Sequence, residues 1–482
     1  MRKLCESGVS FQTADPLLQK LVDTAEKKSL ENLKDFGGRT VLIEGGGYEK
    51  IWLETQPMGG EMYAKRNMEA ALNNQLLFME HAREDGRIPG SIAMIDGKVT
   101  PQFNKFQGFC FPAPALNMYY LIGEDREYLE LLYTTLERFD DYLWKVRDSD
   151  GDGCLETWCK YDTGEDHAMR YGDAPDAWTE EVPPQGCEKV PIASIDIMSF
   201  SYAARETLQK ISAILGKEEW ENRWKQAADS VKKKIREYLW SEELGMCLDR
   251  DRNHAVMPVK MHNTLRAMYW NSISQDMADR FAREHLLNPE EFWTKMPLPS
   301  VAVNDPLFRN VTTNNWSGQA EALTYQRAIL ALENYGYEWI QPLLGRKLFE
   351  AIGEKCVFVQ QYDRILFNYV LQRGGRVELQ PIAEVPTQWQ SELDVFEATL
   401  KHEQHVTSLI NNLYALTHQE NDYATQSMLK WFVDEQVEEE ENATNIIDNL
   451  KMLNGNGYGI FMMDKDLAAR VYTQAAPLAG KA

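Results

Sequence analysis

The sequence predicts an all-α protein in two parts: a toroid or solenoid of helical hairpins, followed by a fragment of a helix bundle. Apolar residues recur with helical spacing along most of the chain, whereas few segments alternate with a period of two. Short turns such as Gly216-Lys217 and Gly336 separate consecutive helical stretches, as in antiparallel helical hairpins. All seven cysteines lie between Cys5 and Cys356, so the composition changes near residue 360. We therefore predict one domain over residues 1–363 and another over residues 364–482.

The composition is that of a folded, acidic protein. Of the 482 residues, 44% are hydrophobic and 26% are charged, and the net charge is −23. This charge argues against nucleic acid or an anionic membrane surface as the main partner. No apolar run has the length of a membrane-spanning helix, and residues 1–11 lack the apolar run of a signal peptide. Scattered cysteines are typical of reduced thiols, and we expect a cytoplasmic protein.

The first domain is predicted to consist of helices joined by long aromatic loops. Functional residues are expected on the loops at one end of the ring. The helical stretches share apolar residues at i, i+3 and i+4. They are Leu17–Leu33, Met62–Ala82, Tyr128–Val146, Met198–Leu215, Glu218–Trp240, His262–Ile273, Gln275–Leu287, Ser317–Tyr335 and Trp339–Ile352.

The second domain is predicted to contain two long amphipathic helices, about Ser391–Leu416 and Ala424–Met452. The run Asn454-Gly455-Asn456-Gly457 breaks the chain before a short closing helix, Lys465–Tyr472. Such helices form part of a bundle.

Three loops of the first domain combine aromatic rings with carboxylates or amides. One contains Trp52, Glu54 and Gln56, the second runs from Leu155 to Asp166 and contains Trp158, and the third contains Trp316. Aromatic rings stack on the apolar faces of sugars, while carboxylates and amides bond sugar hydroxyls. The alternative is that these side chains are buried anchors of the loops. The residues alone leave both interpretations open.

The order of six short motifs resembles that of trehalases and mannosylglycerate-hydrolase-like members of the six-hairpin, (α/α)6-barrel glycosidases. The resemblance covers about residues 15–363. The motifs are Trp52-Leu53-Glu54, Gly86-Arg87-Ile88-Pro89-Gly90, Phe111-Pro112-Ala113-Pro114-Ala115, Thr163-Gly164-Glu165-Asp166-His167, Ser194-Ile195-Asp196 and Asn314-Asn315-Trp316-Ser317-Gly318.

This resemblance implies hydrolysis of an O-glycosidic bond in a small sugar or sugar conjugate, by inversion. It implies that Asp166 is the general acid. The residues expected to bind substrate are Trp52, Gln56, Arg87, Trp158 and Trp316.

Inversion also requires a carboxylate base across the sugar ring. The resemblance places this base at Gln360, where related enzymes carry Glu, and an amide cannot take up a proton at working pH. Either another carboxylate serves, with Glu54 as the candidate, or the enzyme is impaired. The predicted helices also fall short of six hairpins, so we expect the last hairpin of the toroid to be missing.

The run Asp148-Ser149-Asp150-Gly151-Asp152-Gly153 resembles the opening of a calcium loop. An EF-hand needs Glu at the twelfth position, which Cys159 occupies here. A tight acidic turn and a bound calcium ion are the two alternatives.

Carboxylates interrupt the apolar stripes of the two long helices in the second domain. Glu403 lies in the first stripe, and Gln436 and Glu439 lie in the second, within the acidic run Asp434–Glu441. Carboxylates that point into a bundle are costly unless they are paired or bound to metal, and their mutual repulsion favours a cation. A solvated acidic face is the alternative.

This domain closely resembles the C-terminal part of non-haem ferritins, over about residues 364–475. The matching runs are Phe367-Asn368-Tyr369, Arg373 to Leu379, His402-Glu403, Glu435 to Glu439, and Asp464 to Leu467. The resemblance implies iron ligation by Glu403, Gln436 and Glu439, with Glu435 and Glu438 near an accessory iron.

The first helix of a ferritin bundle and most of the second are absent from the predicted segment. We therefore expect weak iron binding and no ferroxidase activity. The chain is interpreted as a chimera of two incomplete parts, joined in nature or during sequence assembly. Its expected partners are a small carbohydrate and iron ions, and a homo-oligomer stays open. The competing hypothesis is an iron-binding, ferritin-like protein that carries an inactive glycosidase-like passenger.

Overall fold

The computed structural model describes residues 9–45, 48–309, 316–352, 361–362, 389–453 and 455–468. The chain forms two compact units, Met1–Glu378 and Leu379–Ala482. The predicted all-α class is confirmed, because helices dominate and the described strands are only two to five residues long. The predicted domain junction at residue 363 lies outside the described residues and stays a prediction.

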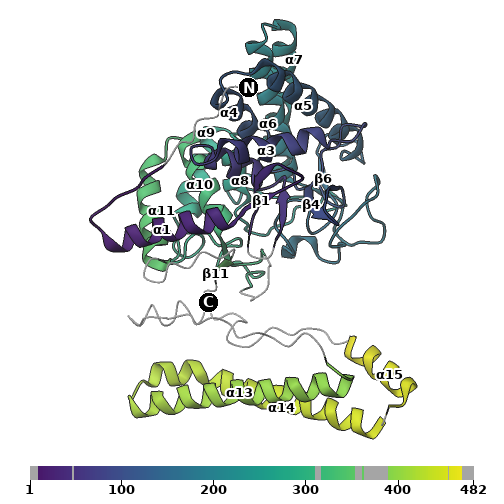
Figure 1. The fold of residues 1–482 in the computed structure, drawn as a ribbon, viewed down its shortest axis with the longest axis vertical. Coiled ribbons are helices and arrows are strands. Elements are labelled where there is room, and N and C mark those ends of the chain that lie inside the picture. The colour runs from purple at the N-terminus through teal and green to yellow at the C-terminus, as the bar shows by residue number, and fades with distance from the viewer. Residues whose placement is uncertain are drawn as a thin grey trace. The chain divides into compact units, whose positions relative to one another are not determined.

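Helical hairpins build the first unit, as Figure 1 shows. Helix α6 packs along α7, and α2 packs along α3. The helices are α1 (Pro16–Glu31), α2 (Gln56–Tyr63), α3 (Met68–Glu80), α4 (Pro112–Leu121), α5 (Arg126–Val146), α6 (Ile195–Ile214), α7 (Glu218–Lys234), α8 (Asn263–Tyr269), α9 (Gln275–Phe281), α10 (Ala322–Asn334) and α11 (Gln341–Ile352).

Short antiparallel strands join the helices. Strands β3, β4 and β5 form a three-stranded sheet, and the others form pairs. They are β1 (Leu33–Asp35), β2 (Thr40–Leu42), β3 (Lys50–Trp52), β4 (Ser91–Ile95), β5 (Lys98–Gln102), β6 (Glu156–Thr157), β7 (Ile192–Ala193), β8 (Trp240–Ser241), β9 (Met246–Cys247), β10 (Ala320–Glu321) and β11 (Gln361–Tyr362).

The helices differ from the prediction at two places for identifiable reasons. The stretch Met62–Ala82 is divided into α2 and α3, because the Asn67 side chain accepts a hydrogen bond from the amide of Ala70 and so starts a new helix. Helix α4 is not among the predicted helices and begins at Pro112. Pro112 and Pro114 lie in its first turn, where a missing amide hydrogen costs nothing.

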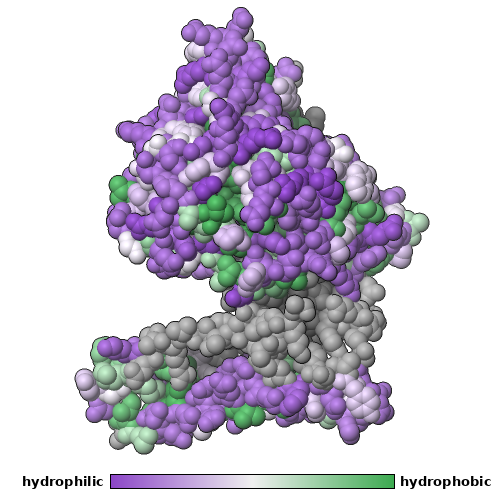
Figure 2. Space-filling view, turned by 180° about the vertical axis from the view of Figure 1, so that it is seen from behind, coloured by the Kyte–Doolittle hydropathy of each residue, from purple (hydrophilic) through white to green (hydrophobic). Residues whose placement is uncertain are grey.

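Aromatic side chains fill the core of the first unit. Phe106 packs edge-on against Phe200, at 5.4 Å between ring centres, and Phe139 packs against both. Helix α6 passes through this core, with most of its residues buried. The face seen in Figure 2 is correspondingly mainly hydrophilic. This rigid helical body supports the loops that carry the predicted site.

The second unit is a helical hairpin followed by a short helix. Helices α13 (Glu392–Gln419) and α14 (Tyr423–Leu453) pack along each other. Helix α15 (Gly457–Ala468) begins earlier than the predicted Lys465, because the Asn456 side chain accepts hydrogen bonds from the amides of Tyr458 and Gly459. A residue expected to break the chain thus caps a helix.

Within the described ranges, no helix combines the length and the apolar character needed to cross a membrane. The described cysteines, Cys110, Cys154, Cys159, Cys187 and Cys247, are free thiols.

Candidate functional site

The loop that carries Asp166 lies between β6 and β7 and is held by buried hydrogen bonds. The Asp162 carboxylate accepts bonds from the amides of Phe106 and Trp158 and from the guanidinium of Arg147, at 2.6–2.7 Å. Burial alone would raise the pKa of Asp162, but Arg147 and the two amides hold it below its usual value. The first half of the loop is therefore fixed to the core.

The second half is fixed through Glu165, which directly precedes Asp166. Its fully buried carboxylate lies 2.7 Å from Arg170, 2.6 Å from Arg266 and 3.1 Å from Nε2 of His262. Burial disfavours its charge, yet Arg266 and Arg170 outweigh burial and keep the pKa of Glu165 well below its usual value. The sequence does not mark Glu165 as important, although it lies inside a recognised motif.

Further buried carboxylates balance the two arginines. Arg170 lies 2.7 Å from Asp196, at the start of α6, and 2.7 Å from Asp249. Asp196 belongs to the Ser194-Ile195-Asp196 motif, so two of the motifs named from the sequence meet in one charge network.

The structure brings Asp166 and Trp316 together, although 150 residues separate them in the sequence. The amide of Trp316 donates a 3.0 Å hydrogen bond to the carbonyl oxygen of Asp166. The Trp316 ring packs edge-on against His262, which contacts Glu165. These contacts connect Asp166, Trp316, His262 and Glu165 to one another. The side chain of Asp166, the predicted general acid, is half-buried.

Glu54 reaches the same loop from the start of α2. It is buried and lies 2.6 Å from the guanidinium of Arg327. A Cβ atom at Gly164 would lie 1.9 Å from Cδ of Glu54, so only glycine permits this approach. The Glu54 carboxyl group therefore packs against Gly164, which lies two residues before Asp166 in the sequence.

Glu44 is a third carboxylate of this site, and sequence reasoning missed it. Burial, with the nearby charges of Glu54 and Asp166, raises the pKa of Glu44 to about 8, against an opposing effect of Arg327. Glu44 follows the apolar run Val41-Leu42-Ile43. A carboxylate at the end of a buried strand was the signal that could have identified it.

The predicted aromatic residue Trp52 lies at the same end of the fold and is half-buried. The ammonium of Lys105 lies 4.8 Å from its ring centre, and Tyr48 packs edge-on against it. Burial lowers the pKa of Lys105, which the negative charge of Asp166 opposes. Lys105 therefore contacts Trp52 and is also close enough to Asp166 to feel its charge.

Three residues that the sequence predicts as substrate contacts, Gln56, Arg87 and Trp158, have protein partners in the structure. Gln56 is buried and accepts a hydrogen bond from the amide of Trp52. Arg87 donates to Glu181 and to the carbonyl oxygen of Phe103.

Trp158 differs most from its predicted role. It is fully buried, its indole donates to Glu156, and the guanidinium of Arg147 lies 4.1 Å from its ring centre. Its ring has no exposed face on which a sugar could stack, so it anchors the loop.

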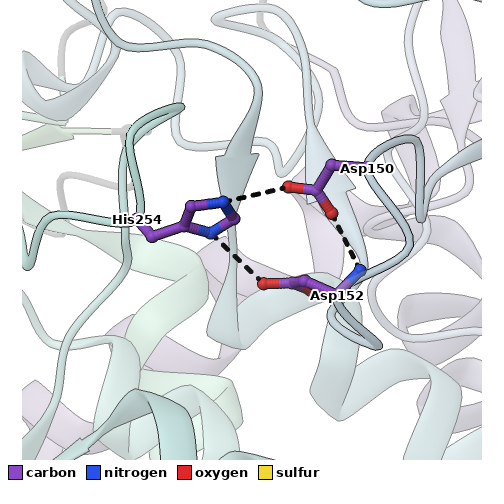
Figure 3. Close-up of side chains that lie close together, drawn as sticks. All are labelled: Asp150, Asp152 and His254. Carbon is purple, nitrogen blue, oxygen red and sulfur yellow. Dashed lines mark hydrogen bonds and ion pairs between the residues drawn. The ribbon is translucent and has the colours of Figure 1, made fainter.

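The acidic run Asp148–Gly153 forms a tight turn. Its carboxylates accept backbone hydrogen bonds at Gly153, Asp152 and Cys154. Figure 3 shows His254 facing Asp150 and Asp152, at 3.7 and 3.5 Å. Cys159, at the twelfth position of the predicted loop, is buried and does not complete a calcium shell. Of the two alternatives, the structure supports the acidic turn, and calcium is not supported.

The predicted metal ligands of the second unit lie on the hairpin. The amide of Gln436 donates a 3.1 Å hydrogen bond to Glu403, which joins α14 to α13. Burial, together with the charges of Glu438 and Glu439, raises the pKa of Glu435. Glu438 and Glu439 are exposed. The structure thus brings Glu403 and Gln436 into contact, whereas Glu438 and Glu439 remain exposed on α14.

The family model of the mannosylglycerate hydrolase MGH1-like glycoside hydrolase domain matches residues 52–365. The chain belongs to this glycoside hydrolase family. The ferritin-like domain model matches residues 361–453. This glycoside hydrolase therefore carries a ferritin-like domain after its toroid, as the two resemblances in the sequence imply.

Solved structures support the fold of the hydrolase domain. A GH63 mannosylglycerate hydrolase from Thermus thermophilus, in complex with glucose, aligns over 73% of this chain and 95% of its own, with a TM-score of 0.54 and 16% identity. A neutral trehalase from Saccharomyces cerevisiae aligns over 68% of this chain and 70% of its own, with a TM-score of 0.54 and 14% identity.

The C-terminal part is similar in sequence to a bacterial non-heme ferritin from Bacteroides fragilis strain 638R. The two are 42% identical over 103 residues, which cover 21% of this chain and 64% of the ferritin. The chain therefore spans less than two thirds of that relative.

Proposed function

We propose that the first unit hydrolyses the O-glycosidic bond of a small sugar or sugar conjugate by inversion, with Asp166 as the general acid. The observation that carries this proposal is the position of Asp166. It lies on a loop that buried ion pairs hold in place. Trp316 donates a backbone hydrogen bond to it, Glu54 packs against the same loop, and its charge acts on Lys105. Such a fixed carboxyl group beside aromatic rings suits proton donation to a sugar oxygen.

The reaction needs one acid and one base. Asp166 would give its proton to the leaving oxygen as the bond from that oxygen to the anomeric carbon breaks. A water molecule would attack the same carbon from the opposite face and lose a proton to the base. We assign the base to Glu54, because its carboxyl group packs against Gly164. Gly164 lies two residues before Asp166, and two residues of chain span at most about 7 Å, so Glu54 is near the proposed acid.

Glu44 is less suited to the role of base. Because its pKa is about 8, its carboxyl group holds a proton at neutral pH and cannot accept another. Gln360 lies outside the described residues, so its position relative to Asp166 stays a prediction. Trp52 is the proposed substrate contact, whereas Gln56, Arg87 and the two fully buried rings of Trp158 and Trp316 would hold the loops of the site in place.

The mechanism is tested by the stereochemistry of the product. Mannosylglycerate and trehalose are suitable first probes, because the structural relatives carry the names of hydrolases for such compounds. NMR of the first-formed sugar should show the anomer opposite to that of the substrate. Retention of configuration would contradict the assignment of a base that activates water.

The second candidate function is iron binding by the ferritin-like domain. Glu403 and Gln436 supply adjacent oxygen donors, and the buried Oε1 of Gln436 accepts no hydrogen bond in the described structure. Hard oxygen donors suit Fe(II). Glu439 would complete this set of ligands, and Glu435 and Glu438 would hold an accessory ion. Anaerobic titration with Fe(II) should show weak binding, of micromolar affinity or poorer, that Glu403→Ala reduces.

A further inference from the structure

Near Asp166, a buried ammonium group has no hydrogen-bonding partner among the described residues. Lys105 is only 6% exposed, and its Nζ lies 4.8 Å from the ring centre of Trp52 and 5.8 Å from that of Tyr161. Aromatic faces attract a cation, but a buried charge stays costly until an anion pairs with it. An anionic ligand would therefore be stabilised at Lys105.

A second lysine approaches the same tryptophan. Lys50 precedes Trp52 by two residues in β3, so both side chains leave the strand on the same face. Its Nζ lies 5.3 Å from the Trp52 ring centre and donates a 3.1 Å hydrogen bond to Oε1 of Gln102. Because this partner is a neutral amide, it does not balance the charge of Lys50. Within the described ranges, neither Lys50 nor Lys105 forms an ion pair with a carboxylate.

Trp52 adds a hydrogen-bond donor to the two ammonium groups. Its indole Nε1 is buried and has no acceptor among the described residues. The rest of the ring is half-buried, and Tyr48, which packs edge-on against it at 6.1 Å, is 37% exposed. Solvent therefore reaches this group of side chains from the side of Tyr48, and a small ligand can approach it.

We propose that Lys105, Lys50 and Trp52 form a subsite for a phosphate group, so that the hydrolase acts on a phosphorylated sugar conjugate. A phosphate monoester carries about 1.5–2 negative charges at neutral pH and three strong acceptor oxygens, which suit two ammonium groups and one indole N–H. Lysine binds phosphate as a point charge, whereas the planar fork of arginine is better suited to a carboxylate. This inference rests on the proposed function for the remainder of the substrate.

The nearby carboxyl group of Asp166 is compatible with a bound phosphate. A general acid holds its proton until the glycosidic bond breaks, so Asp166 is uncharged when the substrate binds. A negative charge close to a carboxyl group disfavours the loss of its proton. The phosphate would therefore favour the protonated form of Asp166 that the reaction requires.

Calorimetric titration of the full chain with three monosaccharides tests the subsite without turnover. Glucose is neutral, glucuronate carries a carboxylate at C6, and glucose 6-phosphate carries a phosphate there. We expect glucose 6-phosphate to bind at least tenfold more tightly than the other two. Lys105→Met keeps the length of the side chain without its charge and should remove this preference. Lys98→Met is the matched control, because it removes an exposed lysine from the same sheet and should leave the preference unchanged.

Two further variants separate a lost charge from a disturbed fold. Lys105→Arg keeps the positive charge and should retain most of the preference for phosphate, and Lys50→Met, at a half-buried position, should weaken it. Equal binding of glucose and glucose 6-phosphate, tighter binding of glucuronate, or a preference that both methionine variants retain would overturn the proposal. Phosphate-dependent binding by a chain that hydrolyses no glycoside would support the subsite and contradict only the proposed hydrolysis.

Discussion

Next to Asp166, a network of buried charged side chains holds Glu165 in place. Among the residues that the structure describes, Glu165, Asp196 and Asp249 pair with the guanidinium groups of Arg170 and Arg266 in a buried region. Buried ions are stable only while each keeps its partners. The residue beside the proposed acid therefore has a structural role that its position in the sequence does not reveal.

Glu165→Gln should lower the free energy of unfolding by about 1–3 kcal/mol, because the fully buried side chain loses its charge-assisted hydrogen bonds to Arg170 and Arg266, although Asp196 and Asp249 still balance the two guanidinium groups. Urea unfolding measures this loss. Glu188→Gln, at an exposed glutamate, is the control and should change stability by less than about 0.5 kcal/mol. Equal effects of the two substitutions would contradict the buried charge network.

Glu44 should make stability depend on pH. Its pKa rises from an ordinary 4.5 to about 8 in the folded chain, so the folded state holds a proton that the unfolded state loses. Its contribution is fully present below pH 4.5 and is lost as the pH rises toward 8. In Glu44→Gln this decline should be smaller, by on the order of a few kcal/mol in the unfolding free energy. Parallel pH profiles for variant and wild type would contradict the burial of Glu44 among carboxylates.

At the scale of elements, the loop of Asp166 depends on one glycine. Gly164 and Gly151 have nearly the same positive φ, 72° and 71°, but only Gly164 lies against another side chain. Gly164→Ala and Gly151→Ala therefore incur the same backbone strain, about 1–2 kcal/mol. Only Gly164→Ala must also displace Glu54.

The difference between these two variants should be several kcal/mol in thermal or urea unfolding, and only Gly164→Ala should impair turnover. If both variants lose the same stability and activity, then Glu54 does not pack against this loop.

Helices were predictable from the sequence because their apolar spacing is local. The boundaries that differ, at Asn67, Pro112 and Asn456, depend on caps and first-turn positions that a periodic pattern does not contain. Asp166 and Trp52 could be selected from their motifs as the proposed acid and the proposed substrate contact. Glu44 and Glu165 could not, since their importance comes from partners distant in the sequence. Trp158 shows the reverse, because an aromatic loop residue is equally suited to the core.

At the scale of the whole molecule, the chain joins a glycoside hydrolase domain to a ferritin-like one, and the two need not share a function. The proposed iron ligands Glu403, Gln436 and Glu439 are fewer than a di-iron centre requires. The hairpin alone should therefore bind iron without oxidising it rapidly.

Mixing the aerobic protein with Fe(II) should give no fast rise in the absorbance of ferric product, since two irons must be held together for rapid oxidation. A fast phase with a stoichiometry of two irons per chain would show that other residues, or a second copy, complete the centre. Wild type with Mn(II) already bound serves as the comparison for occupied sites.

The central claim is that Asp166 is the general acid of a glycosidase, and its most direct test is turnover of small glycosides by three forms of the chain. The wild type and Asp173→Asn, which alters an exposed aspartate of the same loop region, should have similar rates. Asp166→Asn should be slower by roughly 10²–10⁴-fold, because it removes the proton donor. Hydrolysis by the Asp166→Asn variant at the wild-type rate, or a wild type that hydrolyses none of these glycosides, would contradict the claim.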